Sequence, residues 1–255
     1  MREMGLSDRI VGRHAFDTAT DPQIPVVGDI TGVDQEAFLR IAPQLVLVQR
    51  SAQSPPDFLV RSDAEGRFSL VVVPLLSLDD IPGAVRIMDR HIASIEQRAP
   101  MLADPDSAAS KLVARMELAF APHPARYADA GRVLLLASIN PPAAFGPGSW
   151  HHDLLLRVGA TPAITDGAPY ITIDTEEILR LKPDAIILIE AQDPDPTPIL
   201  TRLGPLSKLN VPAIANGRLA AIDDPFIMTP SPAMIDFAQR LDVLLRDWSR
   251  ASETP

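Results

Sequence analysis

The sequence predicts an α/β protein of two lobes, each built on a parallel sheet with helices on its faces. Three observations support this prediction: short apolar runs alternate with helical patterns, one helix–strand unit occurs twice, and an alanine-rich helical segment lies between the two copies. Strands that alternate with helices are typical of parallel sheets, because a crossover must return the chain to the same end of the sheet. The expected divisions are residues 1–103 for the first lobe, 104–122 for the connecting helix and 123–255 for the second lobe.

Short apolar runs along the chain are expected to form buried strands. These runs are residues 45–48, 68–73, 133–136, 185–189 and 219–222. The segments between them show the apolar spacing of amphipathic helices. The predicted helices are residues 34–42, 78–97, 107–120, 174–181 and 231–248.

An internal repeat relates the two halves of the chain. Residues 34–48 align without gaps with residues 174–188, at a constant offset of 140 positions (174 − 34). Asp, Glu, Leu, Arg and Pro coincide, and an apolar run follows the proline in both copies. Two such units with matching details indicate two similar lobes.

Each copy of the repeat has signals for a short helix that leads into a strand. Asp34 and Asp174 are expected to cap the helices by accepting hydrogen bonds from free backbone N–H groups. Glu177, three residues after Asp174, is expected to complete an arrangement like a capping box. Pro43 and Pro183 end the helices and turn the chain into the strands.

The alanine-rich segment 107–120 is interpreted as the helix that connects the lobes. Its apolar residues recur at helical spacing and form one face. They are Ala109, Leu112, Val113, Met116 and Phe120. A connecting helix resists hinge motion better than a flexible linker does.

Composition excludes several classes of function. The 255 residues carry a net charge of −10, which opposes binding to nucleic acid or to anionic lipid. There is no cysteine, which excludes disulfides, thiolate metal sites and cysteine nucleophiles. No apolar run approaches the roughly 20 residues of a membrane helix, and the first nine residues are polar, without the apolar core of a signal peptide. Taken literally, the chain is expected to be soluble and to stay where it is made.

Five segments together resemble the landmarks of one protein family. They read GLSDRIVGRHAFD, IPVVGDITGVDQEAFLRIAPQLVLV, FGPGSWHHDLLLRVGA, YITIDTEEILRLKPDAIIL and LNVPAIANGRLAAIDDP. Their order and spacing, from about Gly5 to Leu245, are similar to those of the helical-backbone periplasmic binding proteins of cobalamin, heme and ferric-siderophore ABC importers. The resemblance implies two Rossmann-like lobes, a bound corrinoid or ferric chelate rather than a covalent cofactor, an ABC permease as partner, an extracytoplasmic location and a monomer.

The start of the chain departs from the family pattern. In the family a strand and a helix precede the segment that matches Gly5–Gly12, and the strand ends in a loop that lines the ligand cleft. Residues 2–6 match only the tail of that helix, so the N-terminal strand is expected to be missing from the first lobe. A start site placed too late, or a truncated gene, would account for this; a protein that really lacks the strand would have an open sheet edge.

Glu36 and Glu176 occupy equivalent positions in the first turns of the two repeated helices. By the resemblance, one glutamate per lobe docks to arginines of the permease. Alternatively, each carboxylate only complements the dipole of its helix.

The loop after the run 9–12 is expected to face the ligand, because ligands bind beyond the carboxyl ends of parallel strands. Its candidate contacts are Arg13, His14, Phe16 and Asp17. His14 is interpreted as an axial metal ligand, a hydrogen-bond donor or a plain loop residue.

In the second lobe the candidate ligand contacts are aromatic or sulfur-containing. They are Phe145, Trp150, Tyr170, Phe226 and Met228. Trp150 follows the glycine-rich segment 146–149 and suits stacking on a flat macrocycle, unless it is wedged in the core of its own lobe. Met228 and Phe226 offer adaptable apolar contact in the loop after the last strand.

Several alternatives remain open at this stage. No catalytic motif is found, so a binding protein is favoured over an enzyme that uses Asp17 with Asp223 or Asp224 as an acid–base pair. A cytoplasmic relative without a transport role would bind a corrinoid or another cofactor. Direct metal binding would use His14, His152 and the Asp223–Asp224 pair, although His151 and His152 as helix neighbours cannot easily share one metal. Cobalamin is the preferred ligand because of the Val11-Gly12-Arg13 segment and the aromatic candidates.

Overall fold

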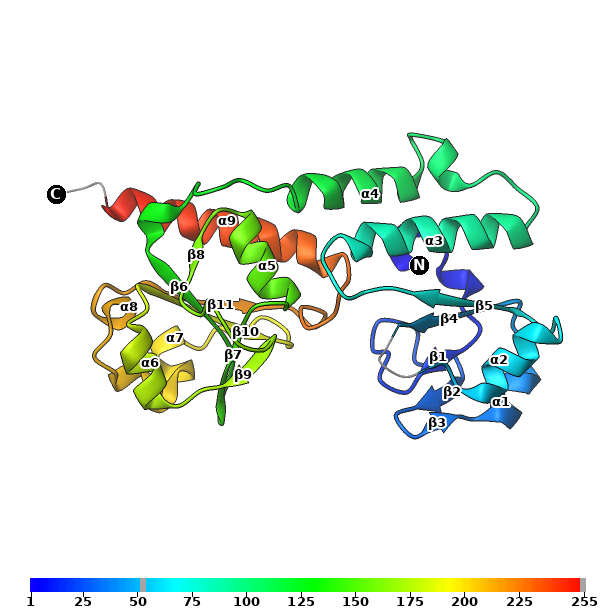
Figure 1. The fold of residues 1–255 in the computed structure, drawn as a ribbon, viewed down its shortest axis with the longest axis horizontal. Helices are drawn as coiled ribbons and strands as arrows, with labels where there is room; N and C mark the ends of the chain where they lie inside the picture. Colours follow the sequence, from blue (N-terminus) through cyan, green and yellow to red (C-terminus); the bar gives the residue numbers. More distant parts are fainter. Residues whose placement is uncertain (51–53, 253–255) are drawn as a thin grey trace. The chain divides into compact units, whose positions relative to one another are not determined.

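The computed structural model describes residues 1–50 and 54–252, which form two compact units. Unit 1 comprises residues 1–76 and 80–115, and unit 2 comprises residues 77–79 and 116–255. In both units strands alternate with helices along the chain (Figure 1). The predicted α/β class is confirmed.

Unit 1 contains short strands and four helices among its described residues, the last of which continues into unit 2. The strands are β1 (Arg13–His14), β2 (Val26–Asp29), β3 (Gly32–Val33), β4 (Leu45–Gln49) and β5 (Ser69–Val73). The helices are α1 (Gln35–Ile41), α2 (Asp57–Ala64), α3 (Asp80–Ile95) and α4 (Ala108–Ala119). The boundary between the units falls within α4, after Arg115, so a continuous helix carries the chain from one unit to the next.

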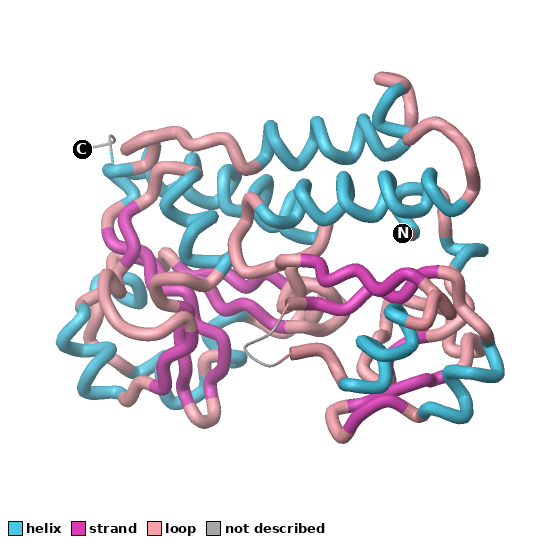
Figure 2. The backbone as a smooth tube through the Cα atoms, turned by 45° about the vertical axis from the view of Figure 1, so that its right-hand side comes forward, coloured by secondary structure: helices cyan, strands magenta, loops and turns pink. Residues whose placement is uncertain are grey.

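Unit 2 is built on one larger sheet. Its strands are β6 (Arg132–Ile139), β7 (Pro142–Phe145), β8 (Thr161–Pro162), β9 (Tyr170–Thr172), β10 (Ala185–Glu190) and β11 (Leu219–Asp223). Its helices are α5 (Trp150–Arg157), α6 (Thr175–Leu181), α7 (Ile199–Arg202), α8 (Pro212–Ala215) and α9 (Ala233–Ser252). Helices α5 and α9 lie on one side of the sheet, and α6, α7 and α8 lie on the other (Figures 1 and 2).

The sheet of unit 2 is parallel at its centre and antiparallel on one side. Its strand order is β11-β10-β6-β7-β9, with β8 paired to β6. The pairs β10–β11, β10–β6 and β6–β8 are parallel, as predicted. The expectation of a wholly parallel sheet is wrong for β7 and β9, which pair antiparallel. Only two residues, Asn140 and Pro141, separate β6 from β7, and so short a connection produces a hairpin.

The strands of unit 1 form two separate sheets. Strands β4 and β5 make a parallel pair, and β1 and β2 are parallel with β3 antiparallel at the end. The start of this unit corrects one expectation, since the run 9–12 is not a strand: Ser7–Arg9 form a 3-10 helix, and β1 begins at Arg13.

The internal repeat is confirmed in three dimensions. Helices α1 and α6, and the starts of β4 and β10, differ by the same 140 positions (175 − 35 and 185 − 45). The Asp34 carboxylate accepts from Ala37 N at 3.0 Å, and the Asp174 carboxylate accepts from Glu177 N at 2.7 Å. Both helices also end on a left-handed residue, Ala42 or Lys182, with φ of 43° and 46°.

The capping box expected at Glu177 is not formed. Its carboxylate accepts two hydrogen bonds from Arg180, at 2.5 and 3.1 Å, instead of reaching back to Asp174. The i,i+3 pair with arginine competes with the cap for the same carboxylate.

The core of unit 2 surrounds β10, whose apolar residues are all buried. Leu134 and Leu136 of β6 pack beside it with Ile178 of α6 and Leu206. The core of unit 1 is smaller and contains Phe38, Val46, Leu59 and Phe68. Within the part of the chain that the structure describes, no helix is long and apolar enough to cross a membrane.

Candidate functional site

The loop after β1 is organised by Arg13. Its guanidinium donates to the carbonyl oxygens of Ile24 (3.1 Å), Asp17 (3.2 Å) and Pro22 (3.3 Å). Three hydrogen bonds to backbone carbonyls of one loop fix the shape of that loop. The Arg13 guanidinium therefore uses these donors within its own unit.

Asp17 also forms hydrogen bonds within its loop, whereas Phe16 is exposed. The Asp17 carboxylate accepts from Ala19 N (2.9 Å), Thr20 N (3.1 Å) and Thr20 Oγ1 (2.5 Å). His14 Nδ1 accepts from Phe16 N at 3.2 Å, and the two rings lie 5.7 Å apart. Phe16 has 67% of its surface exposed, which leaves its ring face open to another molecule.

The segment that leads into α5 is shaped by close backbone contacts. Ser149 caps the helix, accepting from His152 N at 3.1 Å and donating to Gly146 O at 2.8 Å. A Cβ on Gly146 would lie 2.4 Å from Ala168 O, so only glycine fits there. Because β7 runs antiparallel to β6, this segment follows a hairpin and not a parallel strand.

Three of the aromatic candidates of unit 2 lie around this segment. Phe145 is buried and stacks on His151, with ring centroids 3.9 Å apart. Tyr170, which is 56% exposed, meets the Phe145 ring edge-on at 6.4 Å. Trp150 is half-buried, and its Nε1 has no hydrogen-bond partner among the described residues. Tyr170 is therefore accessible, and the buried Phe145 ring packs against it.

His151 links α5 to the loop that follows β11. Its Nε2 lies 2.9 Å from Ile227 O, and its ring packs between Phe145 and Phe237. Burial lowers the pKa of His151 from 6.5 to about 4, since the charged imidazolium is poorly solvated there. The half-buried Phe226 and Met228 flank Ile227 in this loop, so the histidine holds the segment that carries both candidate contacts.

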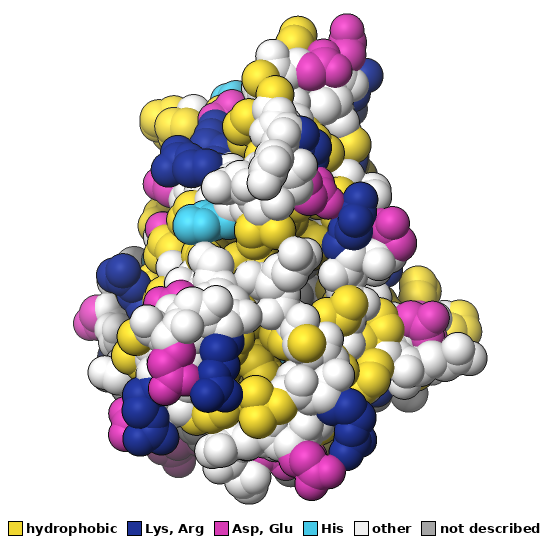
Figure 3. All heavy atoms as spheres, turned by 90° about the vertical axis from the view of Figure 1, so that its right-hand side faces the viewer, with side chains coloured by type: hydrophobic (Ala, Val, Ile, Leu, Met, Phe, Trp, Pro, Cys, Tyr) yellow, Lys and Arg dark blue, Asp and Glu magenta, His cyan; other side chains and the backbone are white. Residues whose placement is uncertain are grey.

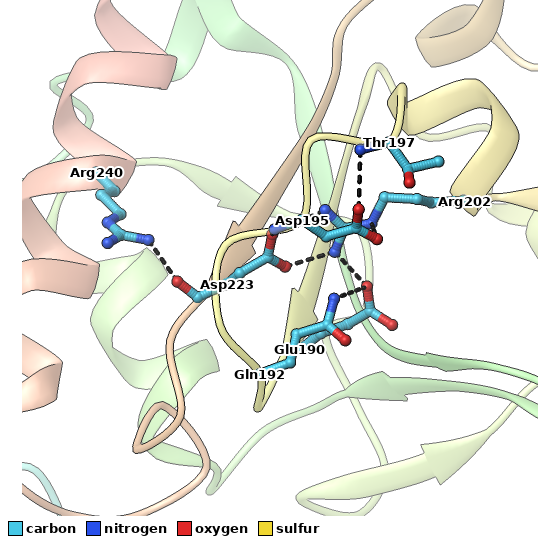
Figure 4. Close-up of polar contacts among 7 residues, drawn as sticks. All are labelled: Glu190, Gln192, Asp195, Thr197, Arg202, Asp223 and Arg240. Atoms are coloured by element: carbon cyan, nitrogen blue, oxygen red, sulfur yellow. Dashed lines mark hydrogen bonds and ion pairs between the residues drawn. The ribbon is translucent and has the colours of Figure 1, made fainter.

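A buried ion-pair network lies at the carboxyl ends of β10 and β11 (Figure 4). Glu190 and Asp223, the last residues of the two strands, are in register, and Arg202 of α7 forms ion pairs with both. Arg202 Nη1 also donates to Asp223 Oδ2 at 2.8 Å. The side chains of Arg202 and Asp223 are only 7% and 8% exposed.

The network also holds the loop that follows β10. Asp223 Oδ2 accepts from Asp195 N at 3.1 Å, and Asp195 Oδ1 accepts from Thr197 N at 2.9 Å. Arg240 of α9 donates to Asp223 O at 2.8 Å. The Arg202 guanidinium holds the pKa of the Asp223 carboxyl below its usual range, and Asp223 in turn raises the pKa of Arg202.

Arg202 was not among the site residues predicted from the sequence. A signal was present, because both buried apolar runs of β10 and β11 end in an acid, Glu190 and Asp223. Acids at the ends of adjacent buried strands need a cation. The sequence does not show which of the 23 Lys and Arg residues supplies it.

The alternative metal site and the alternative acid–base pair both use residues with other roles. His152 Nε2 lies 3.0 Å from Ile164 O, and Asp223 is engaged by Arg202. Asp224 Oδ1 accepts from Phe226 N at 2.7 Å. Across residues 1–50 and 54–252, no group of three or more His, Cys, Asp or Glu residues could hold a metal ion. His151 and His152 bond to different carbonyls, as expected for helix neighbours.

Glu36 and Glu176 are exposed in the first turns of α1 and α6. Arg40 Nη2 donates to Glu36 Oε1 at 2.7 Å. The equivalent arginine, Arg180, binds Glu177, and no described residue binds the Glu176 carboxylate. Both carboxylates are therefore accessible, although their immediate neighbours differ.

The fold is similar to that of periplasmic binding proteins of known structure. The periplasmic vitamin B12 binding protein of Vibrio cholerae aligns with a TM-score of 0.70 and 18% identity, over 97% of this chain and 92% of that protein. The periplasmic heme-binding protein of the same organism has a TM-score of 0.67 and 16% identity, over 95% and 92% of the two chains. A Fe³⁺-hydroxamate ABC transport protein of Saccharomonospora viridis has a TM-score of 0.57 and 20% identity, over 96% and 88%.

No protein-family model and no curated protein match the chain. The predicted resemblance is thus confirmed at the level of the fold, which is that of two-lobed periplasmic binding proteins. The three neighbours are described as binding or transport proteins rather than as enzymes. Identities of 16 to 20% do not carry a ligand from any one of them to this chain.

Proposed function

We propose that this chain is the substrate-binding component of an ABC importer that takes up cobalamin or a ferric chelate such as heme or a ferric siderophore. The single observation that supports this most strongly is the match of 97% of the chain to a vitamin B12 binding protein fold. Its compartment is then extracytoplasmic, and its partner is a membrane permease.

Each unit supplies exposed aromatic surface suited to a flat, bulky ligand. Phe16 in unit 1 and Tyr170 in unit 2 are 67% and 56% exposed, yet both belong to ordered segments with hydrogen-bonded backbones. Aromatic rings held in this way lose little conformational entropy when a macrocycle stacks on them. In the proposal these two rings and Trp150 contact the ligand, His14 supplies a donor or an axial ligand, and Phe226 and Met228 add apolar contact. Arg13, Asp17 and Phe145 keep the contact residues in place.

Binding is tested with cyanocobalamin, hemin and ferrichrome, each titrated into the purified chain and followed by tryptophan fluorescence and calorimetry. One of the three is expected to bind, and Phe16→Ala and Tyr170→Ala are each expected to weaken it about tenfold, the loss of one aromatic contact. Leu118→Ala, which removes a more exposed apolar side chain from α4, is the control. Failure of all three compounds and of related chelates to bind would contradict the proposed function.

Glu36 and Glu176 are proposed to dock on the permease. Their equivalent places in the repeat give the two units one exposed carboxylate each, at the start of a helix of the same length. Carboxylates on a rigid helix can form charge-assisted pairs with arginines of a partner without rearrangement.

Reversing both charges is expected to abolish uptake and to leave ligand affinity unchanged. The double variant Glu36→Lys with Glu176→Lys is compared in cells with a control that reverses Glu65 and Asp106, two other exposed acids of unit 1. Uptake of radiolabelled ligand and the dissociation constant of the purified variant are both measured. Normal uptake by the Glu36 and Glu176 variant would refute the docking role without touching the proposal that the chain binds a ligand.

A further inference from the structure

The two repeated helices, α1 and α6, coincide at exposed positions and differ at buried ones. Their sequences read QEAFLRI and TEEILRL, and the order of exposed, half-buried and buried residues is the same in both. Every buried or half-buried position holds a different residue in the two helices. The identical residues are Glu36, Leu39 and Arg40 of α1, with their equivalents in α6, and all of them are exposed.

This pattern is the reverse of what the fold requires. Substitutions at exposed helix positions usually change stability little, so two helices that share only a fold have no reason to keep the same exposed residues. Helix propensity does not single out leucine either, because alanine, lysine, glutamate and glutamine form helices about as well. The coincidence at exposed positions therefore points to a surface function that the two units share.

Of the shared exposed residues, the leucine is the one to which no described contact assigns a role. The glutamates are the proposed docking carboxylates, and each arginine forms an ion pair with an acid of its own helix. Leu39 and Leu179 are 48% and 38% exposed. Neither is among the described members of the core clusters that contain Phe38 and Ile178, so each leaves apolar surface open to a partner.

Each leucine lies on the same helix face as the docking carboxylate. Leu39 follows Glu36 by three residues, and Leu179 follows Glu176 by three, a spacing that makes the two side chains surface neighbours. Exposed apolar side chains also lie between charged ones on the face of the molecule seen in Figure 3, so a single such leucine would carry no argument. The same carboxylate–leucine pair at equivalent places in both units does carry one.

We propose that Leu39 and Leu179 are the apolar anchors of the docking surface, and that their partner is a membrane permease which offers the same site twice, an apolar pocket beside an arginine or lysine. The inference rests on the proposed function, which supplies the permease. The carboxylate selects the cation, and burial of the leucine adds affinity that salt does not screen. Because both units carry the same pair, a permease built from two like subunits fits them.

Uptake is measured in spheroplasts of the source cells that lack their own copy of the chain, to which purified chain loaded with radiolabelled ligand is added. Leu39→Ala with Leu179→Ala is expected to raise the concentration of chain that gives half-maximal uptake at least about tenfold, since two half-exposed leucines lose their burial. Ligand affinity and the unfolding midpoint are expected to stay unchanged. Leu118→Ala with Leu156→Ala is the control, in which Leu156 is 49% exposed. Methionine at positions 39 and 179 is expected to restore normal uptake.

Photo-cross-linking identifies the partner without relying on the ligand. A photoreactive benzoylphenylalanine replaces Leu39, Leu179 or, as the control, Leu156, and the cross-linked protein is identified by mass spectrometry. The first two replacements are expected to capture the same transmembrane permease subunit at the same peptide, and the control is expected not to. Capture of a second copy of this chain or of a soluble protein, equal capture from all three positions, or no capture would overturn the proposal.

Failure of this inference and failure of the proposed function give different results. Normal uptake by the leucine double variant, together with loss of uptake when Glu36 and Glu176 are reversed, would overturn the leucine anchors and leave the docking carboxylates and the bound ligand in place. If the chain binds none of the tested compounds, the ligand proposal fails, and the cross-links from positions 39 and 179 still decide whether the leucines contact a permease.

Discussion

Replacing Arg202 by methionine is expected to lower the free energy of unfolding by about 3–5 kcal/mol, the cost of leaving the buried Asp223 carboxylate without its partner. Arg202 is 7% exposed and pairs with Glu190 and Asp223 at the ends of two core strands. Methionine has nearly the volume of the arginine stem, so the loss comes from charge rather than from a cavity. Urea denaturation of the purified variant measures the change.

The matched control is Arg40→Met in α1. Arg40 pairs with Glu36, but both side chains are mostly exposed, and such a pair contributes less than about 1 kcal/mol. A further variant that adds Glu190→Leu and Asp223→Leu to Arg202→Met removes the unpaired charges and is expected to recover much of the stability. Equal losses in Arg202→Met and Arg40→Met would refute the assigned role of the network.

The stability deficit of the Arg202 variant is also expected to depend on pH. In the native protein the pKa of Asp223 is lowered, chiefly by Arg202, so its contribution is present above the unfolded value of about 3.9 and is lost as pH falls through the folded pKa. Without Arg202 the buried carboxyl has a raised pKa, and protonation stabilises the variant. The deficit of the variant relative to the parent protein is therefore expected to shrink as pH is lowered from 7 toward 5, a comparison in which groups common to both proteins cancel.

The second large effect is acid destabilisation through His151. Its pKa is about 4 in the folded protein and about 6.5 when unfolded, so folding favours the neutral ring. The stability that depends on this neutral ring is complete above pH 6.5 and is lost progressively as pH falls toward 4. The difference of about 2.5 pKa units corresponds to about 3 kcal/mol at most. Unfolding free energies measured at half-unit steps between pH 7 and 4 report the slope.

His151→Phe is expected to flatten this slope. The ring would still pack between Phe145 and Phe237, but Ile227 O would lose its donor, at a cost of about 1–3 kcal/mol at pH 7. The same change at the exposed His123 is the control and is expected to leave the slope as it is. An unchanged slope in His151→Phe would mean that other groups cause the acid sensitivity.

The repeat and the alternation of elements could be predicted because they depend on local chemistry. Asp34 and Asp174 cap their helices through backbone groups three residues away, and Pro43 and Pro183 precede strands that start two residues later. All the residues that form such a helix cap or helix-to-strand turn lie within about ten residues of one another. Strands β7 and β9 were not among the predicted strands, because runs of four and three residues are too short to give a clear period.

The candidate site was predicted only in part, because the roles of its residues depend on partners far along the chain. Phe16 and Tyr170 are exposed as expected of contact residues, whereas Arg13 and Asp17 are used to shape their own loop. His151 contacts Ile227, which lies 76 positions later in the sequence, and no local pattern predicts this contact.

The amino-acid sequence was sufficient to predict an α/β chain with a duplicated helix–strand unit, since periodicity, caps and prolines act over one or two turns of backbone. The tertiary structure alone decided which strands are paired on both edges, which acids meet Arg202 and which aromatic rings stay open to solvent. The physical reason is that strand pairing, side-chain burial and pKa values depend on groups that packing brings together. These groups lie far apart in the sequence, so no local pattern predicts their contacts.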